Sequence, residues 1–385
     1  MRQTVFKEFG WAYAASATSF GASLVVLFAF GSGARGEFAH LFAVANVSLA
    51  LVAFAALEQS AANGRILTRA LLLHIAMSCL SSISTILWLR LGATSTIGHI
   101  LSIGIVLWCV STAISSTVLG VLKRFSMSIE INLIRVAFGV ASIAFIGLAS
   151  IYSKHASAVF MAYALGNVVS TALAVTMLGR VAARSALIPV AKYSRSTNLV
   201  GLGLTGVLTS FWMNIEAILG PNIASFEEIG IYATLKSIFL AVGPIISVIA
   251  VRHYGSNKAS TRTLIQWPVR HSLVLAGSIL ILCCLVIAGA EGYRRYYHLP
   301  QIASIPSILL LSIGMYFSFL VSWLDEIFKA HGDFASVTVS LLIGCVAAWA
   351  ISHAVSGLSA LGMVLVAAGC CRTLYYAVVV YRTPC

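Results

Sequence analysis

The sequence predicts an all-α polytopic membrane protein with about twelve transmembrane helices in two six-helix lobes. Three observations lead to this prediction. The chain of 385 residues is 60% hydrophobic and only 9% charged, whereas about a quarter of the residues in a soluble domain are charged. About twelve apolar segments are long enough to cross a hydrocarbon core of about 30 Å. A polar stretch lies between the sixth and seventh of these segments.

The apolar segments follow one another with short connections. None shows the alternation of period two that is typical of a transmembrane strand. Their expected limits are 8–31, 37–57, 67–90, 97–122, 131–152, 156–178, 197–220, 228–250, 269–290, 304–328, 334–354 and 357–380. The chain is therefore expected to be a helical bundle without a sizeable domain outside the membrane.

Basic residues in the loops predict the orientation. If the N-terminus is cytoplasmic, most of them fall on the cytoplasmic side, as the positive-inside rule requires. These residues are Arg2, Lys7, Arg65, Arg69, Lys123, Arg124, Arg180, Arg184, Lys192, Arg195, Arg252, Lys258, Arg262, Arg270, Lys329, Arg372 and Arg382. The opposite side holds Arg35, Arg90, Lys154, Arg294 and Arg295. Both termini are therefore expected in the cytoplasm, and Arg135 and Lys236 are left inside spans.

The polar stretch at residues 179–196 is expected to be a cytoplasmic linker between lobes of residues 1–178 and 197–385. A shift of 191 residues aligns residues 18–20 with residues 209–211, both of which read Thr-Ser-Phe. An even number of helices in each lobe makes such a repeat parallel, with a pseudo-two-fold axis along the membrane normal. Two lobes of this kind would face each other across a central cleft.

Lys236 is the first candidate functional residue, because it lies nine residues after Glu227 within an apolar run. At 1.5 Å per residue it would be roughly 13 Å from the start of its helix, close to the middle of the bilayer. A charge at this depth usually faces a wet cavity or a partner. We expect Lys236 to bind an anionic group in a central cavity; the alternative is an ion pair with Glu216 of the preceding helix. Glu216 is expected either at the interface or in the cavity as a counter-ion.

Three arginines complete the candidate substrate-binding set. Arg135 lies about one turn from the cytoplasmic end of the fifth span. It either snorkels to the interface or faces the cavity as a phosphate ligand. Arg35 and Arg69 lie at the mouths of first-half helices, where each is an interfacial anchor or a further ligand.

A cluster of charges lies near the cytoplasmic end of the tenth span. Asp325 and Glu326 precede Lys329 by four and three residues, so all three share a helix face. We expect a local ion pair there; the alternative is a gate linked to a proton or a cation.

Several classes of function lack a sequence signature. The eight cysteines include no C-x-x-C pair, and the histidines show no ligand spacing. No metal site, cofactor or catalytic residue is therefore expected. The formal charge of +13 is explained by the basic loops, so nucleic-acid binding is not expected. There is no phosphate-binding G-x-x-x-x-G-K-[ST] motif, so ATP bound to this chain would not drive transport.

Residues 211–236, F-W-M-N-I-E-A-I-L-G-P-N-I-A-S-F-E-E-I-G-I-Y-A-T-L-K, resemble the start of the second half of polysaccharide-exporter (O-antigen, Wzx-like) flippases. This family belongs to the MOP superfamily, together with the MATE multidrug exporters and the lipid II flippases. Residues 33–42 resemble the matching element of the first half, with Ala39 where glycine is usual. Residues 330–344 and 355–364 are similar to the family's eleventh and twelfth helices.

The resemblance implies a multi-pass flippase of the bacterial inner membrane, surrounded by membrane lipids. It would move a polyprenyl-pyrophosphate-linked oligosaccharide across the membrane by alternating access. Coupling to H⁺ or Na⁺ and contact with other polysaccharide-assembly proteins are left open. The cations named above would hold the pyrophosphate. A polar path for the sugar is expected along Asn46, Ser48, Ser81, Ser115, Ser116, Asn167 and Ser170.

Two alternatives belong to other classes. A MATE-type antiporter that exports organic cations would share the fold, but it needs carboxylates inside the membrane, and the first half has none in the middle of a span. A membrane-embedded polysaccharide polymerase or ligase would need a large basic external loop. The longest external loop, near 291–303, is short but contains Arg294, Arg295 and His298.

Overall fold

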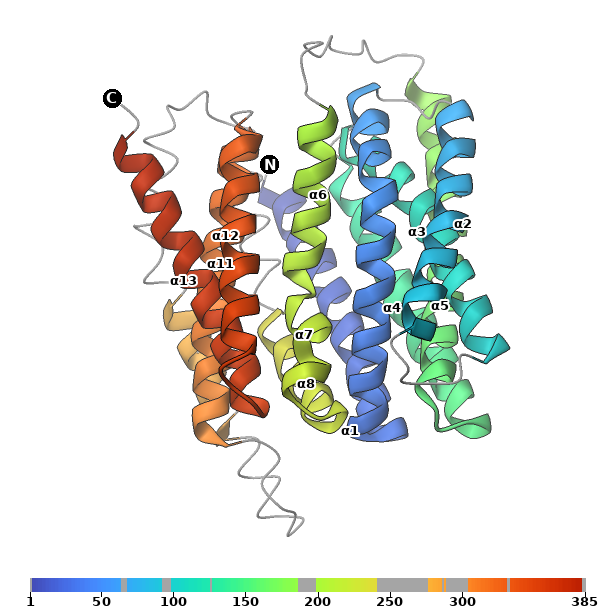
Figure 1. Cartoon of the computed structure of the whole chain (residues 1–385). Helices are drawn as coiled ribbons and strands as arrows, with labels where there is room; N and C mark the ends of the chain where they lie inside the picture. Colours follow the sequence, from blue (N-terminus) through green and yellow to red (C-terminus); the bar gives the residue numbers. More distant parts are fainter. Residues whose placement is uncertain are drawn as a thin grey trace. The chain divides into compact units, whose positions relative to one another are not determined.

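The regular structure of the chain is helical throughout the part that the computed structural model describes (Figure 1). This part comprises residues 2–63, 68–91, 98–124, 127–185, 199–240, 276–285, 287–288, 304–330 and 333–382. Its labelled helices are α1 (Arg2–Asn63), α2 (Thr68–Leu91), α3 (His99–Arg124), α4 (Ser128–Tyr152), α5 (Ala156–Ser185), α6 (Leu199–Met213), α7 (Ile215–Ile223), α8 (Phe226–Leu240), α11 (Ile305–Ala330), α12 (Phe334–Ser352) and α13 (Leu358–Arg382).

These helices confirm the predicted fold class of a polytopic helical membrane protein. Seven described helices are long and apolar enough to cross a membrane. One of them, Gly10–Ala50, accounts for two predicted segments, because α1 leaves helical geometry at Gly31 (φ 88°, ψ 169°). Shorter apolar helices cover Ile75–Leu87, Leu204–Met213 and Ala276–Leu285. The predicted orientation in the membrane stays a prediction.

The chain divides into two compact units. Unit 1 consists of Met1–Ala34 and Leu41–Ser210, and unit 2 of Arg35–His40 and Phe211–Cys385. The boundary near the middle of the chain thus falls within α6. Helix α5 continues to Ser185, which lies within the predicted linker of residues 179–196. Residues 186–198, which include the rest of that linker, lie outside the described residues.

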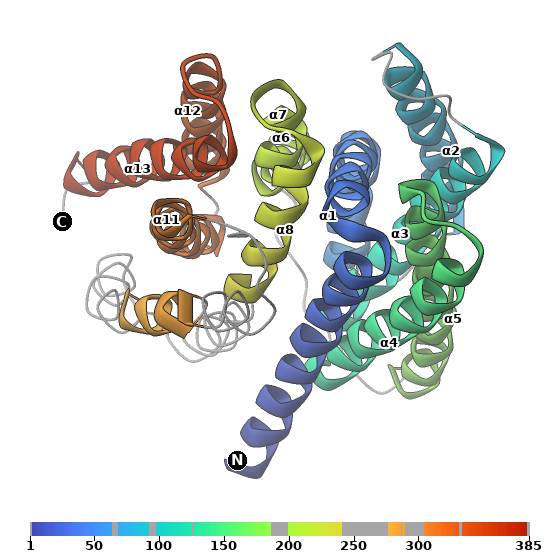
Figure 2. The same cartoon turned by 90° about the horizontal axis from the view of Figure 1, so that it is seen from below.

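Each unit has its own set of packed helices. In unit 1, α5 packs against both α3 and α4, and α2 packs against α3. In unit 2, α13 packs against α11 and α12, while α7 contacts α8, α12 and α13 (Figure 2). All the contacts described below lie within one unit or the other.

The break in α1 at Gly31 is capped from within unit 1. A positive φ is strained for residues with a side chain, so glycine suits this position. Where a helix stops, its last carbonyls lose their partners in the next turn. Lys154, between α4 and α5, donates from Nζ to the carbonyl of Ala29 at 2.8 Å. Its ammonium group also lies over the ring of Phe30, 5.8 Å from the centroid.

The short segment Arg35–His40, just after the break, packs with the residues of unit 2. Proline has no N–H, so Pro221 within α7 leaves the carbonyl of Ala217 without its helical donor. His40 donates from Nδ1 to that carbonyl at 2.8 Å. Gly36 approaches α8 so closely that a Cβ atom would overlap the carbonyl of Phe226. Sequence elements far apart in the chain are therefore joined at this point.

A second tie in unit 2 connects the start of α8 to the start of α13. Ser225 and Glu228 form a capping box, in which Glu228 accepts from the N–H of Ser225 at 2.9 Å and Ser225 accepts from the N–H of Glu228 at 3.3 Å. The other carboxylate oxygen of Glu228 accepts from the N–H of Leu358 at 3.1 Å. One carboxylate thus caps two helix N-termini, where a negative charge is favourable.

The close approach at Gly36 predicts a loss of stability when a side chain is added there. Gly36→Ala should destabilise the protein by about 1–3 kcal/mol, the usual cost of overpacking. Gly33→Ala is the matched control, because a Cβ atom at Gly33 meets no atom within 4 Å. Thermal unfolding in detergent measures the difference, and equal melting temperatures for the two variants would contradict the packing described here.

Candidate functional site

Lys236 and Glu216 form an ion pair in unit 2. Nζ of Lys236 lies 2.9 Å from Oε1 and 3.0 Å from Oε2 of Glu216. It also donates to the carbonyl of Met213 at 3.2 Å. Together these contacts match the three N–H donors of an ammonium group. The structure therefore makes the contact that the sequence analysis gave as the alternative for Lys236.

The local chain path explains how this pair forms. Helices α7 and α8 are separated by two residues and pack against each other, which brings Glu216 and Lys236 together. Helix α6 ends at Met213, so the carbonyl of Met213 is available to a side chain. Tyr232, one turn before Lys236, donates its hydroxyl to Oε1 of Glu216 at 3.3 Å. The Glu216 side chain is only 3% exposed, whereas that of Lys236 is 21% exposed.

Arg135 is placed differently, in helix α4 of unit 1. Ile131 and Ser142, which lie on the same helix face as Arg135, are buried. Leu148 and Ile151 lie on the opposite face and are exposed. Arg135 is nevertheless exposed, and within the described part of the chain it has no hydrogen bond or ion pair. A cation thus projects from the inner face of α4 without a counter-ion among the described residues.

The structure says less about the other two arginines that were predicted to bind the substrate, Arg35 and Arg69. The side chain of Arg35 is largely buried, and its guanidinium group lies over the ring of Phe38, 5.6 Å from the centroid. The side chain of Arg69 lies outside the described residues.

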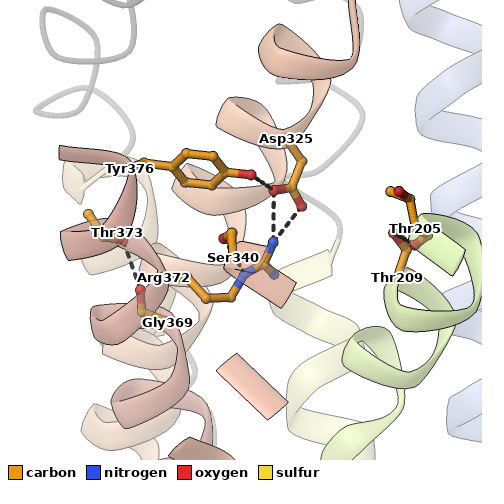
Figure 3. A network of polar contacts seen from close by, with 8 residues as sticks. All are labelled: Thr205, Thr209, Asp325, Ser340, Gly369, Arg372, Thr373 and Tyr376. Carbon is orange, nitrogen blue, oxygen red and sulfur yellow. Dashed lines mark hydrogen bonds and ion pairs between the residues drawn. The ribbon is translucent and has the colours of Figure 1, made fainter. Parts of the chain in front are cut away.

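The structure contains a buried ionic network in unit 2 that the sequence analysis missed (Figure 3). Arg372 was counted among the basic residues of the cytoplasmic side, near the end of the last predicted span, but it lies inside α13 and is 0% exposed. Its Nη2 atom is 2.7 Å from both carboxylate oxygens of Asp325. Its Nε atom donates to Ser340 of α12 at 3.1 Å. The network therefore joins helices α11, α12 and α13.

Two aromatic residues complete this network. The hydroxyl of Tyr376 donates to Oδ1 of Asp325, from one turn beyond Arg372 on α13 (Figure 3). The guanidinium group of Arg372 stacks over the ring of Trp212, 4.6 Å from the centroid, an arrangement favoured by the negative face of the ring. This buried cation is stabilised by the carboxylate of Asp325 and by the π face of Trp212.

The described partner of Asp325 is thus Arg372, 47 residues away in the chain. The side chains of Glu326 and Lys329 lie outside the described residues, so the predicted pair with Lys329 stays a prediction. The residues that are described include no group of three or more histidine, cysteine or acidic side chains that could hold a metal ion.

The predicted polar path in the first half is mostly buried. Ser48, Ser81, Ser115, Asn167 and Ser170 are each 7% exposed or less. The amide of Asn167 in α5 donates to Ser111 and Thr112 of α3, at 2.9 and 2.6 Å. These five side chains therefore do not line an open path, and at least Asn167 serves the contact between α3 and α5. Asn46 and Ser116 are only partly buried.

Comparison with known proteins identifies the fold. A crystal structure of MATE in complex with MaL6 superposes with a TM-score of 0.66 at 12% identity, over 98% of this chain and 95% of that chain. A mutant of the Vibrio cholerae MATE transporter VcmN gives a TM-score of 0.64 at 12% identity, over 98% and 97% of the two chains. The chain has the MATE transporter fold.

The MATE fold also includes a structure with a distinct binding pocket. A MOP superfamily transporter from Pyrococcus furiosus gives a TM-score of 0.57 at 11% identity, over 98% of this chain and 95% of that chain. Reverse polarity of its binding pocket suggests a different function for that protein. No protein-family model and no curated protein sequence matches the present chain.

The buried network predicts strongly coupled effects on stability. Arg372→Met leaves the carboxylate of Asp325 buried without its cation, which should cost about 3–5 kcal/mol. Adding Asp325→Asn removes the uncompensated charge, so the double variant should be more stable than Arg372→Met alone. Thermal unfolding in detergent measures both, with Arg180→Met as a control because Arg180 is exposed. Additive effects of the two changes would contradict the pairing.

Proposed function

We propose that this protein is a flippase for a polyprenyl-pyrophosphate-linked oligosaccharide. It carries the lipid-linked sugar from the cytoplasmic to the periplasmic leaflet of the bacterial inner membrane. The MATE fold supports a transporter that works by alternating access between two lobes. The choice of substrate depends on the charges inside the helices, which are taken one at a time below.

The observation that carries the proposal is the uncompensated cation of unit 1. Arg135 is exposed on the face of α4 that carries the buried Ile131 and Ser142, and it has no counter-ion among the described residues. Guanidinium groups bind phosphate oxygens in a bidentate manner. An anionic ligand would supply the negative charge that the described residues do not place beside Arg135.

Lys236 is the second proposed ligand for the pyrophosphate. Its side chain is the more exposed member of the pair with Glu216, at 21% against 3%, so an anion would approach the lysine first. Glu216 then acts as the resting partner that neutralises Lys236 when no substrate is bound. The pair also explains how a lysine is stable at this depth without a ligand.

The acidic residues of unit 1 agree with an anionic substrate. They are Glu8, Glu58 and Glu130, and each lies within about two turns of a helix end. An organic cation or a coupling ion would need a carboxylate at depth in this unit. The reverse polarity of the pocket in the Pyrococcus furiosus transporter supports the idea that the MATE fold accommodates pockets of different charge.

Arg135 provides the direct test, in proteoliposomes that contain a fluorescent polyprenyl-pyrophosphate-linked oligosaccharide. Arg135→Gln should slow its translocation about tenfold to a hundredfold, the cost of one hydrogen bond to a charged group. Arg135→Lys should retain part of the activity because the charge remains.

Arg180→Gln is the control, because it removes an exposed arginine near the end of α5. It should leave the translocation rate unchanged. Wild-type rates for Arg135→Gln would overturn the assignment of Arg135 to the pyrophosphate.

A second candidate function is MATE-type antiport of organic cations. Two buried carboxylates in unit 2 favour it, those of Glu216 and Asp325. Each is already paired with a basic residue of the same unit, which weakens the case. Antiport predicts that a proton or Na⁺ gradient drives efflux of ethidium from proteoliposomes, and we expect no such efflux.

A further inference from the structure

Four aromatic side chains in unit 1 form a closed ring that the proposed function does not yet use. Phe42 of α1, Trp108 of α3, Phe138 of α4 and Tyr163 of α5 contact one another in turn. Their successive centroids are 4.8 Å (Phe42–Trp108), 6.1 Å (Trp108–Phe138), 5.9 Å (Phe138–Tyr163) and 6.2 Å (Tyr163–Phe42) apart. Four helices therefore meet at one aromatic cluster.

Three of these rings are partly exposed although they project from inner helix faces. Tyr163 shares its face of α5 with the buried Asn167 and Ser170, and the exposed Val168 and Ala172 lie on the other side. In residues 41–50 of α1, every residue is buried except Phe42 and Asn46, which are one turn apart. Trp108, by contrast, is only 6% exposed and is the most buried ring of the cluster.

Asn46 adds a polar group beside the rings. The Nε1–H of Trp108 donates to Oδ1 of Asn46 at 3.2 Å. Because the indole can only donate, this bond fixes the orientation of the amide. Nδ2 of Asn46 has no partner within the described part of the chain, so its two N–H donors are available to a ligand.

The cluster lies next to the proposed phosphate ligand. Phe138 follows Arg135 by three residues on α4, which is about 4.5 Å along the helix axis. In a lipid-linked oligosaccharide the first sugar is bonded directly to the pyrophosphate. A ligand held at Arg135 would therefore place a sugar ring within reach of Phe138.

We propose that Phe42, Phe138 and Tyr163, held in place by Trp108 and Asn46, form a subsite on which a sugar ring of the substrate stacks. This inference rests on the proposed function and adds the saccharide to its recognition. The C–H groups of a sugar face carry partial positive charge, and the face of an aromatic ring is negative. The amide of Asn46 would donate to a sugar hydroxyl, and such a mixture of rings and few polar groups is typical of ligand sites.

The test compares two ligands on the full-length protein in nanodiscs. One is undecaprenyl pyrophosphate, and the other is the lipid-linked oligosaccharide extracted from source cells that lack this protein. Phe138→Leu and Tyr163→Leu should weaken binding of the oligosaccharide form about fivefold or more. Both should leave the affinity for undecaprenyl pyrophosphate unchanged, which also shows that the variants fold. Phe138→Tyr should bind as the wild type does, because it keeps the ring.

Tyr152→Leu is the matched control, since Tyr152 lies at the end of α4 and is 85% exposed. It should change neither affinity. If Phe138→Leu and Tyr163→Leu bind both ligands as the wild type does, or lose both equally, the rings serve packing and the subsite is wrong. Binding of neither ligand by the wild type would instead refute the proposed function, and the subsite with it.

Discussion

The structure depends on one constraint: an ionisable side chain inside a membrane-spanning helix must be neutralised or reach water. In unit 2 the chain supplies the neutralising partners itself. Asp325 is held by Arg372, and Glu216 is held by Lys236. In unit 1, Arg135 is exposed from an inner helix face and has no partner among the described residues. This difference between the units is the physical basis on which we propose an anionic substrate.

Breaks in the helices supply further partners near these charges. The end of α6 at Met213 leaves a carbonyl to which Lys236 donates, and Pro221 leaves a carbonyl to which His40 donates. Irregular backbone inside a membrane needs such contacts, because no lipid can replace a lost hydrogen bond. Transporters commonly place broken helices near their binding sites. The irregular backbone and the Lys236 pair are therefore parts of one local arrangement.

Among the described residues, most predicted spans are helices, because the thickness of the hydrocarbon core sets the length of an apolar run. The predicted span 197–220 is instead divided into α6 and α7, and much of the predicted spans 228–250 and 269–290 lies outside the described residues. The pair of Lys236 with Glu216 could be foreseen as an alternative, since the two residues lie on consecutive helices, 20 residues apart. The role of Arg372 could not be foreseen, because its partner is 47 residues away and a basic residue near the end of a span is typical of the membrane interface. The S-x-x-E pattern of Ser225 and Glu228 is typical of a capping box, so this helix start could have been predicted from the sequence. The exposure of Arg135 depends on how α4 packs against α5 and α3, which the periodicity of the sequence does not report.

The most direct test of the central claim locates the substrate in cells from which the gene has been deleted. A flippase for lipid-linked sugar predicts that polyprenyl-linked oligosaccharide accumulates in the cytoplasmic leaflet while surface polysaccharide is lost. Leaflet-specific enzymatic labelling of the oligosaccharide in oriented membrane vesicles measures this distribution. Normal surface polysaccharide together with new sensitivity to cationic dyes would contradict the account and favour the antiporter.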